Sequence, residues 1–218
     1  FDINKREKID DVNYINRATK GVYELGSVFK TFTLAGALNE GAVDTNTEFK
    51  NLPKKITCAG RPIGEYDNKI PANLTVEQIL IRSGNIGSVR IAQKVGGEKM
   101  RDFLENIGVL NKIEFDIEEV GEPLSFRWGK CKLATASFGH GITTTLLQLG
   151  KGYSIISNGG FDIKPKLIKN KHEESKKIRI LNKEVSKKIN PILRKIVSTK
   201  EGTANFANIE GYEVGGKT

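Results

Sequence analysis

Apolar residues are spaced along the chain in a way that predicts buried helices. From Ser27 to Asn39 nearly every position is apolar or small, and Gly41 follows as a stop signal. A helix that is apolar all round is buried in the middle of a domain. A second helix of this kind is predicted from Thr145 to Ser157, where an Asn-Gly-Gly sequence closes it.

Helices with one apolar face are predicted between these two segments. Thr75 and Gln78 have the spacing of a capping box, so a helix is expected to begin there and to run to Arg82. Two more helices are expected over about residues 86–95 and 98–107, each followed by glycine. Helices therefore dominate the predicted architecture.

Three segments carry weaker signals. Residues 42–72 contain several prolines and glycines and are expected to form a loop region, with weak strand character near Phe49 and Ile56. Residues 1–26 look irregular, and residues 109–141 are mixed and rich in turns.

The last third of the chain is expected to mix strands and helix. Residues 163–168 and 177–181 predict two strands separated by a charged turn. Residues 183–197 predict a helix that Pro191 either kinks or restarts. The final residues, 212–218, start like a strand.

Composition places the chain among globular proteins. It has 218 residues, of which 38% are hydrophobic and 28% charged, with no apolar run near the roughly 18 residues that a membrane helix needs. The net charge of +9 suggests a nucleic-acid partner, but the densest basic segment, Lys164–Lys188, lacks interleaved aromatic residues for base stacking. No nucleic-acid partner is expected.

Cysteine and histidine offer little chemistry. Cys58 and Cys131 allow one disulfide or two free thiols and fit no zinc spacing. His140 is expected to be a turn residue and His172 a solvated one. No metal or other cofactor is expected.

Candidate chemistry begins at Ser27. A serine in the first turn of a helix faces unpaired backbone N–H groups and the positive end of the helix dipole. Lys30 lies three residues on, on the same helix face, and a neutral lysine there could take the serine proton. Because free lysine titrates near ~10.4, burial or a second cation must lower its pKa.

One Ser-x-x-Lys sequence is expected by chance in a chain of this composition, so the pair alone identifies nothing. Two further pieces follow in order, namely Ser83 with Asn85 and Lys217 with Thr218. Ser-x-x-Lys, a Ser-x-Asn relative and Lys-Thr-Gly together are typical of β-lactamases and penicillin-binding proteins.

The chain resembles the class B penicillin-binding proteins, the monofunctional peptidoglycan transpeptidases of cell-wall synthesis. The resemblance covers almost the whole chain. It rests on the following ordered segments: Phe1-Asp2-Ile3-Asn4, Asn16-Arg17-Ala18, Tyr23-Glu24-Leu25-Gly26-Ser27, Ser83-Gly84-Asn85-Ile86-Gly87, Gly139-His140-Gly141-Ile142, Gln148-Leu149, Tyr153, Asn158-Gly159-Gly160, Gly202-Thr203-Ala204 and Gly215-Gly216-Lys217-Thr218.

The resemblance implies a covalent mechanism. Ser27 would attack the carbonyl of the penultimate D-alanine of a peptidoglycan stem peptide, with Lys30 as its general base, and would form an acyl-enzyme. Ser83 would relay the proton to the leaving D-alanine. An amino group from a neighbouring strand would then accept the acyl chain. β-Lactams, which mimic the D-alanyl-D-alanine end, would leave Ser27 stably acylated.

The resemblance also implies how substrate is held. Asn85 would bind the amide of the donor peptide, and Lys217 with Thr218 would anchor the substrate carboxylate. Lys217 would in addition help to keep Lys30 neutral by repulsion between like charges.

The fold that the resemblance implies is of the α+β type, the penicillin-binding protein and serine β-lactamase-like transpeptidase fold, with a helix-rich subdomain and part of an antiparallel sheet. Residues 1–218 are expected to be a partial domain that lacks the first and last strands of this sheet. The glycine and threonine expected after Thr218, which supply half of the family's oxyanion hole, are absent from the sequence. Leu25 and Leu146 stand where the family usually has proline.

Other functions stay open. A class A β-lactamase needs a glutamate that activates water, and neither Glu105 nor Glu122 fits that pattern. A D-alanyl-D-alanine carboxypeptidase would use the same site with water as acceptor, and a β-lactam sensor would acylate without turnover. The resemblance places the protein on the outer, periplasmic face of the bacterial cytoplasmic membrane, with the membrane anchor and the regions that bind other cell-wall synthesis proteins outside this chain. A role in division or in elongation is left open.

Overall fold

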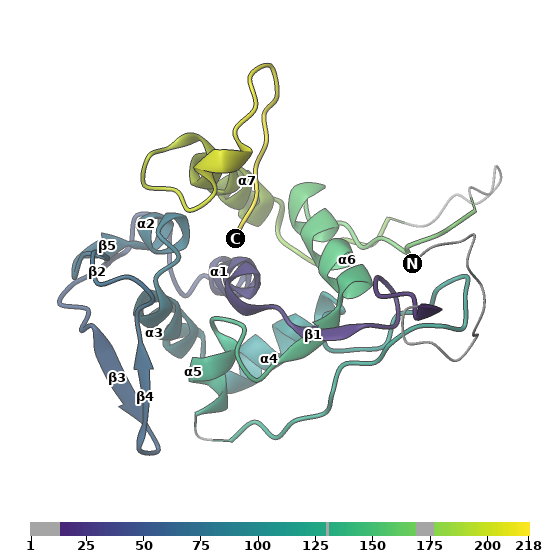
Figure 1. Ribbon diagram of the computed structural model, residues 1–218, viewed down its shortest axis with the longest axis horizontal. Helices are drawn as coiled ribbons and strands as arrows, with labels where there is room; N and C mark the ends of the chain where they lie inside the picture. Colours follow the sequence, from purple (N-terminus) through teal and green to yellow (C-terminus); the bar gives the residue numbers. More distant parts are fainter. Residues whose placement is uncertain (1–13, 130, 169–176) are drawn as a thin grey trace.

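Helix α1 (Lys30–Asn39) lies at the centre of the molecule (Figure 1). The computed structural model describes residues 14–129, 131–168 and 177–218. All eight residues from Lys30 to Ala37 are buried, which confirms the predicted central helix. The helix is entered through a 3-10 turn, η2 (Gly26–Phe29). An all-apolar helix with helices on every side has no need of an amphipathic pattern.

The other helices surround α1, and their ends lie within two residues of the predicted ones wherever a helix was predicted. Helices α2, α3, α4 and α7 all contact α1, while α6 and the short, unpredicted α5 complete the set. Every helix of the described residues is too short or too polar to span a bilayer. The bounds are α2 Val76–Ile81, α3 Asn85–Val95, α4 Gly97–Asn106, α5 Lys132–Ala136, α6 Leu146–Ser157, α7 Lys183–Ser198 and the 3-10 turn η3 Asn205–Ala207.

Two of these helices begin with the same hydrogen-bonded box. The Thr75 hydroxyl accepts from the backbone N–H of Gln78, and the Gln78 side chain accepts from the backbone N–H of Thr75. Thr145 and Gln148 repeat the arrangement at the start of α6. Each box satisfies two N–H groups that the helix cannot pair internally, which is why both starts are sharply defined.

Strands in the described residues form three antiparallel pairs. The pair β3–β4 is a hairpin that projects from the helices near α3 (Figure 1). It lies in the predicted loop region, where the weak strand character expected near Phe49 and Ile56 is confirmed by β2 and β3, whereas β4 was not predicted. The pairs are β1 (Val22–Glu24) with β6 (Thr143–Thr145), β2 (Glu48–Phe49) with β5 (Leu74–Thr75), and β3 (Lys55–Cys58) with β4 (Arg61–Gly64).

Several predictions for the last third of the chain are wrong. In place of two strands at 163–168 and 177–181, the described residues show one isolated bridge between Phe161 and Arg179. The predicted charged turn and His172 lie within residues 169–176, outside the described part. Residues 212–218 form no strand. The helix predicted over 183–197 is confirmed as α7, which continues through Pro191, so the proline does not restart it.

Cys58 and Cys131 form a disulfide. This bond decides between the two alternatives that the sequence leaves open. Cys58 is the last residue of β3, and Cys131 directly precedes α5, so the bond ties the β3–β4 hairpin to the helical body. The bond adds to the packing of β4 on α3 and of the buried Ile63 in the core, and a two-stranded hairpin by itself is at best marginally stable in water.

Removing this disulfide is expected to destabilise the protein. A variant with Cys58→Ala and Cys131→Ala should lose about 2–4 kcal/mol of unfolding free energy, because the bond closes a long loop and so restricts the unfolded chain. The two cysteines are 73 residues apart. Urea unfolding of the oxidised protein and of the double variant measures the difference. Equal midpoints would show that the hairpin does not depend on the bond.

Candidate active site

Ser27 and Lys30 lie on one tight turn. Strand β1 leads into η2, whose 3-10 geometry brings residues three apart into line. The backbone N–H of Lys30 donates to the carbonyl of Ser27, which closes that turn. Ser27 is partly exposed, whereas Lys30 is 1% exposed. A partly exposed serine and a buried lysine therefore share this turn.

Two distant segments hold this turn in place. The backbone N–H of Gly26 donates to the carbonyl of Gly139 at 3.2 Å. A Cβ on Gly139 would lie 2.0 Å from the Gly26 carbonyl oxygen, and Gly139 has a φ of +80°, so the approach requires glycine. On the other side the Tyr153 hydroxyl lies 2.9 Å from the carbonyl oxygen of Val28, to which it donates. The turn that carries Ser27 is thus fixed by tertiary contacts.

The amine of Lys30 points at Ser83. Its Nζ lies 2.5 Å from the Ser83 carbonyl oxygen and 3.0 Å from the Ser83 Oγ. Lys217 reaches the same hydroxyl from the C-terminal segment, with its Nζ 2.8 Å from Ser83 Oγ. The Ser83 hydroxyl therefore lies between two lysine amines that are 187 positions apart in sequence (217 − 30).

Ser83 occupies a backbone conformation that favours glycine. It follows the end of α2 with a φ of +56°. The N–H of Ser83 donates to the Leu80 carbonyl and that of Gly84 to the Ile79 carbonyl, which is the Schellman arrangement of a helix end. A non-glycine residue in this conformation costs on the order of 1–2 kcal/mol. The strain indicates that the hydroxyl serves a purpose other than stability.

The two amines have lowered pKa values. Burial, and then the positive charge of Lys217, lowers the pKa of Lys30 from its ordinary value of 10.5 to about 7, although the negative charge of Glu65 opposes this. Burial also lowers the pKa of Lys217 to about 8. Near neutral pH, Lys30 thus has a substantial neutral fraction while Lys217 stays mostly protonated.

The remaining predicted residues lie at the edges of this cluster. The Asn85 side-chain amide donates to the Gly64 carbonyl at 2.9 Å. Thr218 lies next to Lys217 and its hydroxyl donates to the Thr203 hydroxyl at 2.7 Å. The partners Gly64 and Thr203 come from a loop-like segment and from the stretch after α7, and neither was predicted to support the site.

One acidic residue near the cluster was also not predicted. The Glu65 carboxylate accepts from the backbone N–H groups of Asn85 and Ile86. Its place in the sequence, within a segment rich in proline and glycine, gave no sign of this contact.

A partly exposed serine at a helix start, a buried amine with a pKa near neutrality and a hydroxyl linking that amine to a second cation are the parts of an acyl-transfer site with a serine nucleophile. The family model for the penicillin binding protein transpeptidase domain matches residues 1–218. The chain belongs to this family.

Curated relatives agree with this assignment. The chain is 32% identical over its whole length to a probable peptidoglycan D,D-transpeptidase FtsI of Caulobacter vibrioides, of which it covers 37%. It is 30% identical, again over its whole length, to a probable peptidoglycan D,D-transpeptidase PenA of Neisseria flavescens, of which it covers 54%. The chain thus spans between about a third and a half of the length of these relatives.

Solved structures share the fold. The transpeptidase domain of Burkholderia pseudomallei penicillin-binding protein 3 matches with a TM-score of 0.85 at 27% identity, covering 93% of this chain and 61% of that one. A Burkholderia ambifaria protein described as a peptidoglycan glycosyltransferase matches with a TM-score of 0.86 at 26% identity, covering 94% of this chain and 66% of that one. The predicted α+β transpeptidase fold is confirmed.

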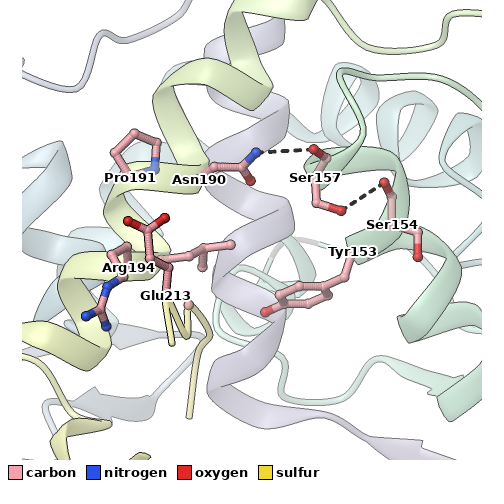
Figure 2. A pocket seen from close by; sticks show the side chains of 9 residues that line it. Tyr153, Ser154, Ser157, Asn190, Pro191, Arg194 and Glu213 are labelled. Carbon is pink, nitrogen blue, oxygen red and sulfur yellow. Dashed lines mark hydrogen bonds between the residues drawn. The ribbon is translucent and has the colours of Figure 1, made fainter. Parts of the chain in front are cut away.

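A hollow of about 660 Å³ lies apart from this cluster, between α6 and α7 (Figure 2). Tyr153 and Ser154 from α6 line one side, and Asn190 and Arg194 from α7 line the other. None of the six predicted site residues is among the described residues that line it. Its connection to the site runs through Tyr153, whose hydroxyl supports the nucleophile turn.

Proposed function

We propose that the protein is an acyl-serine D,D-transpeptidase that cross-links peptidoglycan stem peptides and that β-lactams acylate. The observation that carries the proposal is the Ser83 hydroxyl set between the amines of Lys30 and Lys217, beside the Ser27 turn. This geometry provides a base and a route for its proton. The family membership supports the same reaction.

Ser27 is the nucleophile in this proposal and Lys30 its base. Neutral Lys30 takes the Ser27 proton as Oγ bonds to the carbonyl carbon of the penultimate D-alanine. The N–H groups of the first helical turn, which lack partners within the helix, face the oxygen that becomes negative. Burial of Lys30 makes the neutral base available near pH 7.

Ser83 then passes the proton to the leaving group. With Lys30 neutral and Lys217 charged, Lys217 donates to Ser83 Oγ, and the two N–H groups of Lys30 donate to the Ser83 carbonyl and Oγ, which leaves the Lys30 lone pair for the Ser27 proton and the Ser83 O–H for the leaving group. After the first proton transfer, Lys30 returns the proton through Ser83 to the leaving D-alanine nitrogen as the C–N bond breaks. An acceptor amine next attacks the acyl carbon and loses its proton to Lys30, which passes it to Ser27 Oγ as the ester bond breaks.

The same site suits an anionic substrate. Lys217, with a pKa of about 8, stays mainly cationic at neutral pH, and the Thr218 hydroxyl lies beside it. Together they present a charge and a donor to a terminal carboxylate. Asn85, held by Gly64, supplies amide groups for the donor peptide. The substrate and the β-lactams share this carboxylate.

The disulfide supports the proposed location. Disulfides persist in oxidising compartments such as the bacterial periplasm and are rare in the cytosol. The Cys58–Cys131 bond therefore fits a domain on the outer face of the cytoplasmic membrane. An anchor and contacts to other cell-wall synthesis proteins through further regions belong to the same proposal.

Product analysis tests the function. The intact protein is incubated with a stem-peptide donor ending in D-alanyl-D-alanine and with a separate acceptor amine, and the products are separated and weighed by mass spectrometry. We expect a cross-linked dimer together with free D-alanine. A shortened donor without dimer would indicate a carboxypeptidase. A parallel sample is incubated with a β-lactam. A stable acyl-enzyme with both the donor and the β-lactam, and no released product, would indicate a sensor.

A further inference from the structure

Residues at the end of the β3–β4 hairpin form hydrogen bonds on both sides of the Ser83-Gly84-Asn85 segment. After Ser83, the Glu65 Oε2 accepts from the Asn85 N–H at 2.6 Å and Oε1 accepts from the Ile86 N–H at 2.9 Å. Before Ser83, the Tyr66 hydroxyl donates to the Arg82 carbonyl at 3.1 Å. The Gly64 carbonyl accepts from the Asn85 side-chain amide. Three consecutive residues, Gly64 to Tyr66, thus bind both ends of this turn.

Helix α3 depends on Glu65 for its start. Its N-cap position is Gly84, which has no side chain to accept from the first N–H groups. The Glu65 carboxylate, 20 residues earlier in the chain, supplies both acceptors. Such bonds are charge-assisted, and the negative charge also lies at the positive end of the helix dipole. The orientation of Asn85 therefore depends on this single side chain.

The position of Glu65 is in turn fixed from outside. Four residue pairs hold β3 to β4, and Gly64, the last residue of β4, pairs with Lys55. The disulfide at Cys58 joins the far end of the hairpin to the start of α5. The disulfide thus fixes the far end of the hairpin, and the strand pairing fixes the position of Glu65 at its base.

We propose that Glu65 is a positioning residue of the active site, which sets the Ser83-to-Asn85 turn against Lys30. The inference rests on the proposed function, because the turn matters only if Ser83 and Asn85 act in acyl transfer. Glu65 touches neither substrate nor the reacting atoms; it acts through the backbone N–H groups that it binds.

The charge of Glu65 also reaches the base. It raises the pKa of Lys30, against the lowering by burial and by Lys217. Other charged or titratable groups lie at the same place: Tyr66 and Asp67 follow Glu65 in sequence, and Arg82 lies before Ser83. Burial raises the pKa of Tyr66, as do Asp67 and Glu65, so that it stays neutral in the working range. Lys30 and Lys217, with pKa values of about 7 and about 8, both titrate between pH 5.5 and 9; the charge of Glu65 acts on the pKa of Lys30, whereas burial lowers that of Lys217.

Acylation kinetics across pH test the proposal. The intact protein and its Glu65→Gln and Glu65→Asp variants are mixed with a fluorescent penicillin between pH 5.5 and 9, and the acylation rate is fitted at each pH. Glu65→Gln keeps one acceptor oxygen and loses the charge, so we expect acylation about 10- to 100-fold slower. We also expect its pH midpoint to fall below that of the wild type, because Lys30 loses a neighbouring negative charge.

The variants separate positioning from simple support. Glu65→Asp keeps the charge on a shorter arm, so we expect an unchanged midpoint with a rate at least about 5-fold lower, as one of the two bonds is lost. This comparison stands alone if Glu65→Gln does not fold. Glu48→Gln, an exposed glutamate on β2, is the matched control and should leave rate and midpoint unchanged.

Each outcome decides the matter. Wild-type rates in both Glu65 variants would overturn the proposal, as would slow acylation of Glu65→Gln at an unchanged pH midpoint, since that result assigns Glu65 a structural role only. A wild-type protein that is not acylated at Ser27 would instead overturn the proposed function. Acylation of the wild type at Ser27 with normal Glu65 variants removes this inference alone.

Discussion

Replacing Ser27 by alanine is expected to abolish covalent reaction with penicillin. The wild-type protein should gain the mass of one penicillin per molecule, whereas Ser27→Ala should gain none, because Ser27 supplies the attacking oxygen in the proposed mechanism, with the buried Lys30 on the same turn. Intact-protein mass spectrometry after incubation at pH 7.5 measures the difference. The loss is complete because the adduct is bonded through the Ser27 oxygen.

A matched control guards this result against folding effects. Ser157 is exposed at the end of α6, and its hydroxyl donates only to the Ser154 carbonyl one turn earlier. Ser157→Ala should therefore react like the wild type. An adduct that persists in Ser27→Ala, or that maps by peptide analysis to another residue, would contradict the assignment of the nucleophile.

The helices could be predicted closely because their signals are local. Thr75 with Gln78 and the glycines after residues 95 and 107 are visible in the sequence, and each satisfies or ends a helix by bonds within a few residues. The central helix was equally plain, since a run that is apolar nearly all round is expected to be buried. Local chemistry thus determines both the ends and the burial of these elements.

The strands could not be predicted in the same way. The β3–β4 hairpin carries Pro62 and turns at Ala59-Gly60, which are loop signals, and its pairing is supported by a disulfide 73 residues away. Conversely, 163–168 and 177–181 have strand-like composition but form only a bridge between Phe161 and Arg179. Short strand pairs gain most of their stability from tertiary contacts, which the local pattern does not contain.

The candidate site divides along the same line. Ser27 and Lys30 share one turn, so their spacing alone places them together. The approach of Ser83 and Lys217 to Lys30 is long-range, and only the resemblance to a known family suggested it. The contact of Glu65 with Asn85 could not be predicted because it joins a hairpin to a helix start 20 residues away. Residues that support a site through long-range hydrogen bonds can be identified only from the tertiary structure, which shows their partners.

Ser83 shows that the candidate site lowers the stability of the folded protein. Glycine would relieve the strain of its left-handed backbone at the end of α2. The structure keeps a serine there, and its hydroxyl contacts both lysine amines. A buried amine and a partly buried one facing the same hydroxyl add a further cost, since each would be more favourably charged in water. Strain and desolvation therefore gather at the same few residues, as is usual for functional sites.

Lys30→Met is expected to slow penicillin acylation by about 10²–10⁴-fold, the range typical of losing a positioned general base. Wild-type acylation should rise with pH through a midpoint near 7, the pKa of Lys30, because only the neutral amine accepts a proton. The variant should lack this midpoint. Stopped-flow acylation between pH 5.5 and 9 gives both results, with the exposed Lys50→Met as control.

The pH dependence of the unfolding free energy of Lys30→Met tests whether burial lowers the pKa of Lys30. The pKa of Lys30 is about 7 in the folded protein and ordinarily 10.5, so between these values the unfolded chain binds more protons. Raising the pH therefore stabilises the wild type, by up to about 1.4 kcal/mol per pH unit from this group. Lys217 contributes in the same direction above its pKa of about 8, in both proteins. The difference in unfolding free energy between wild type and Lys30→Met should thus shift in favour of the wild type as pH rises from 7 to 9. A difference that does not change with pH would mean that Lys30 keeps its ordinary pKa, and would remove it as the base.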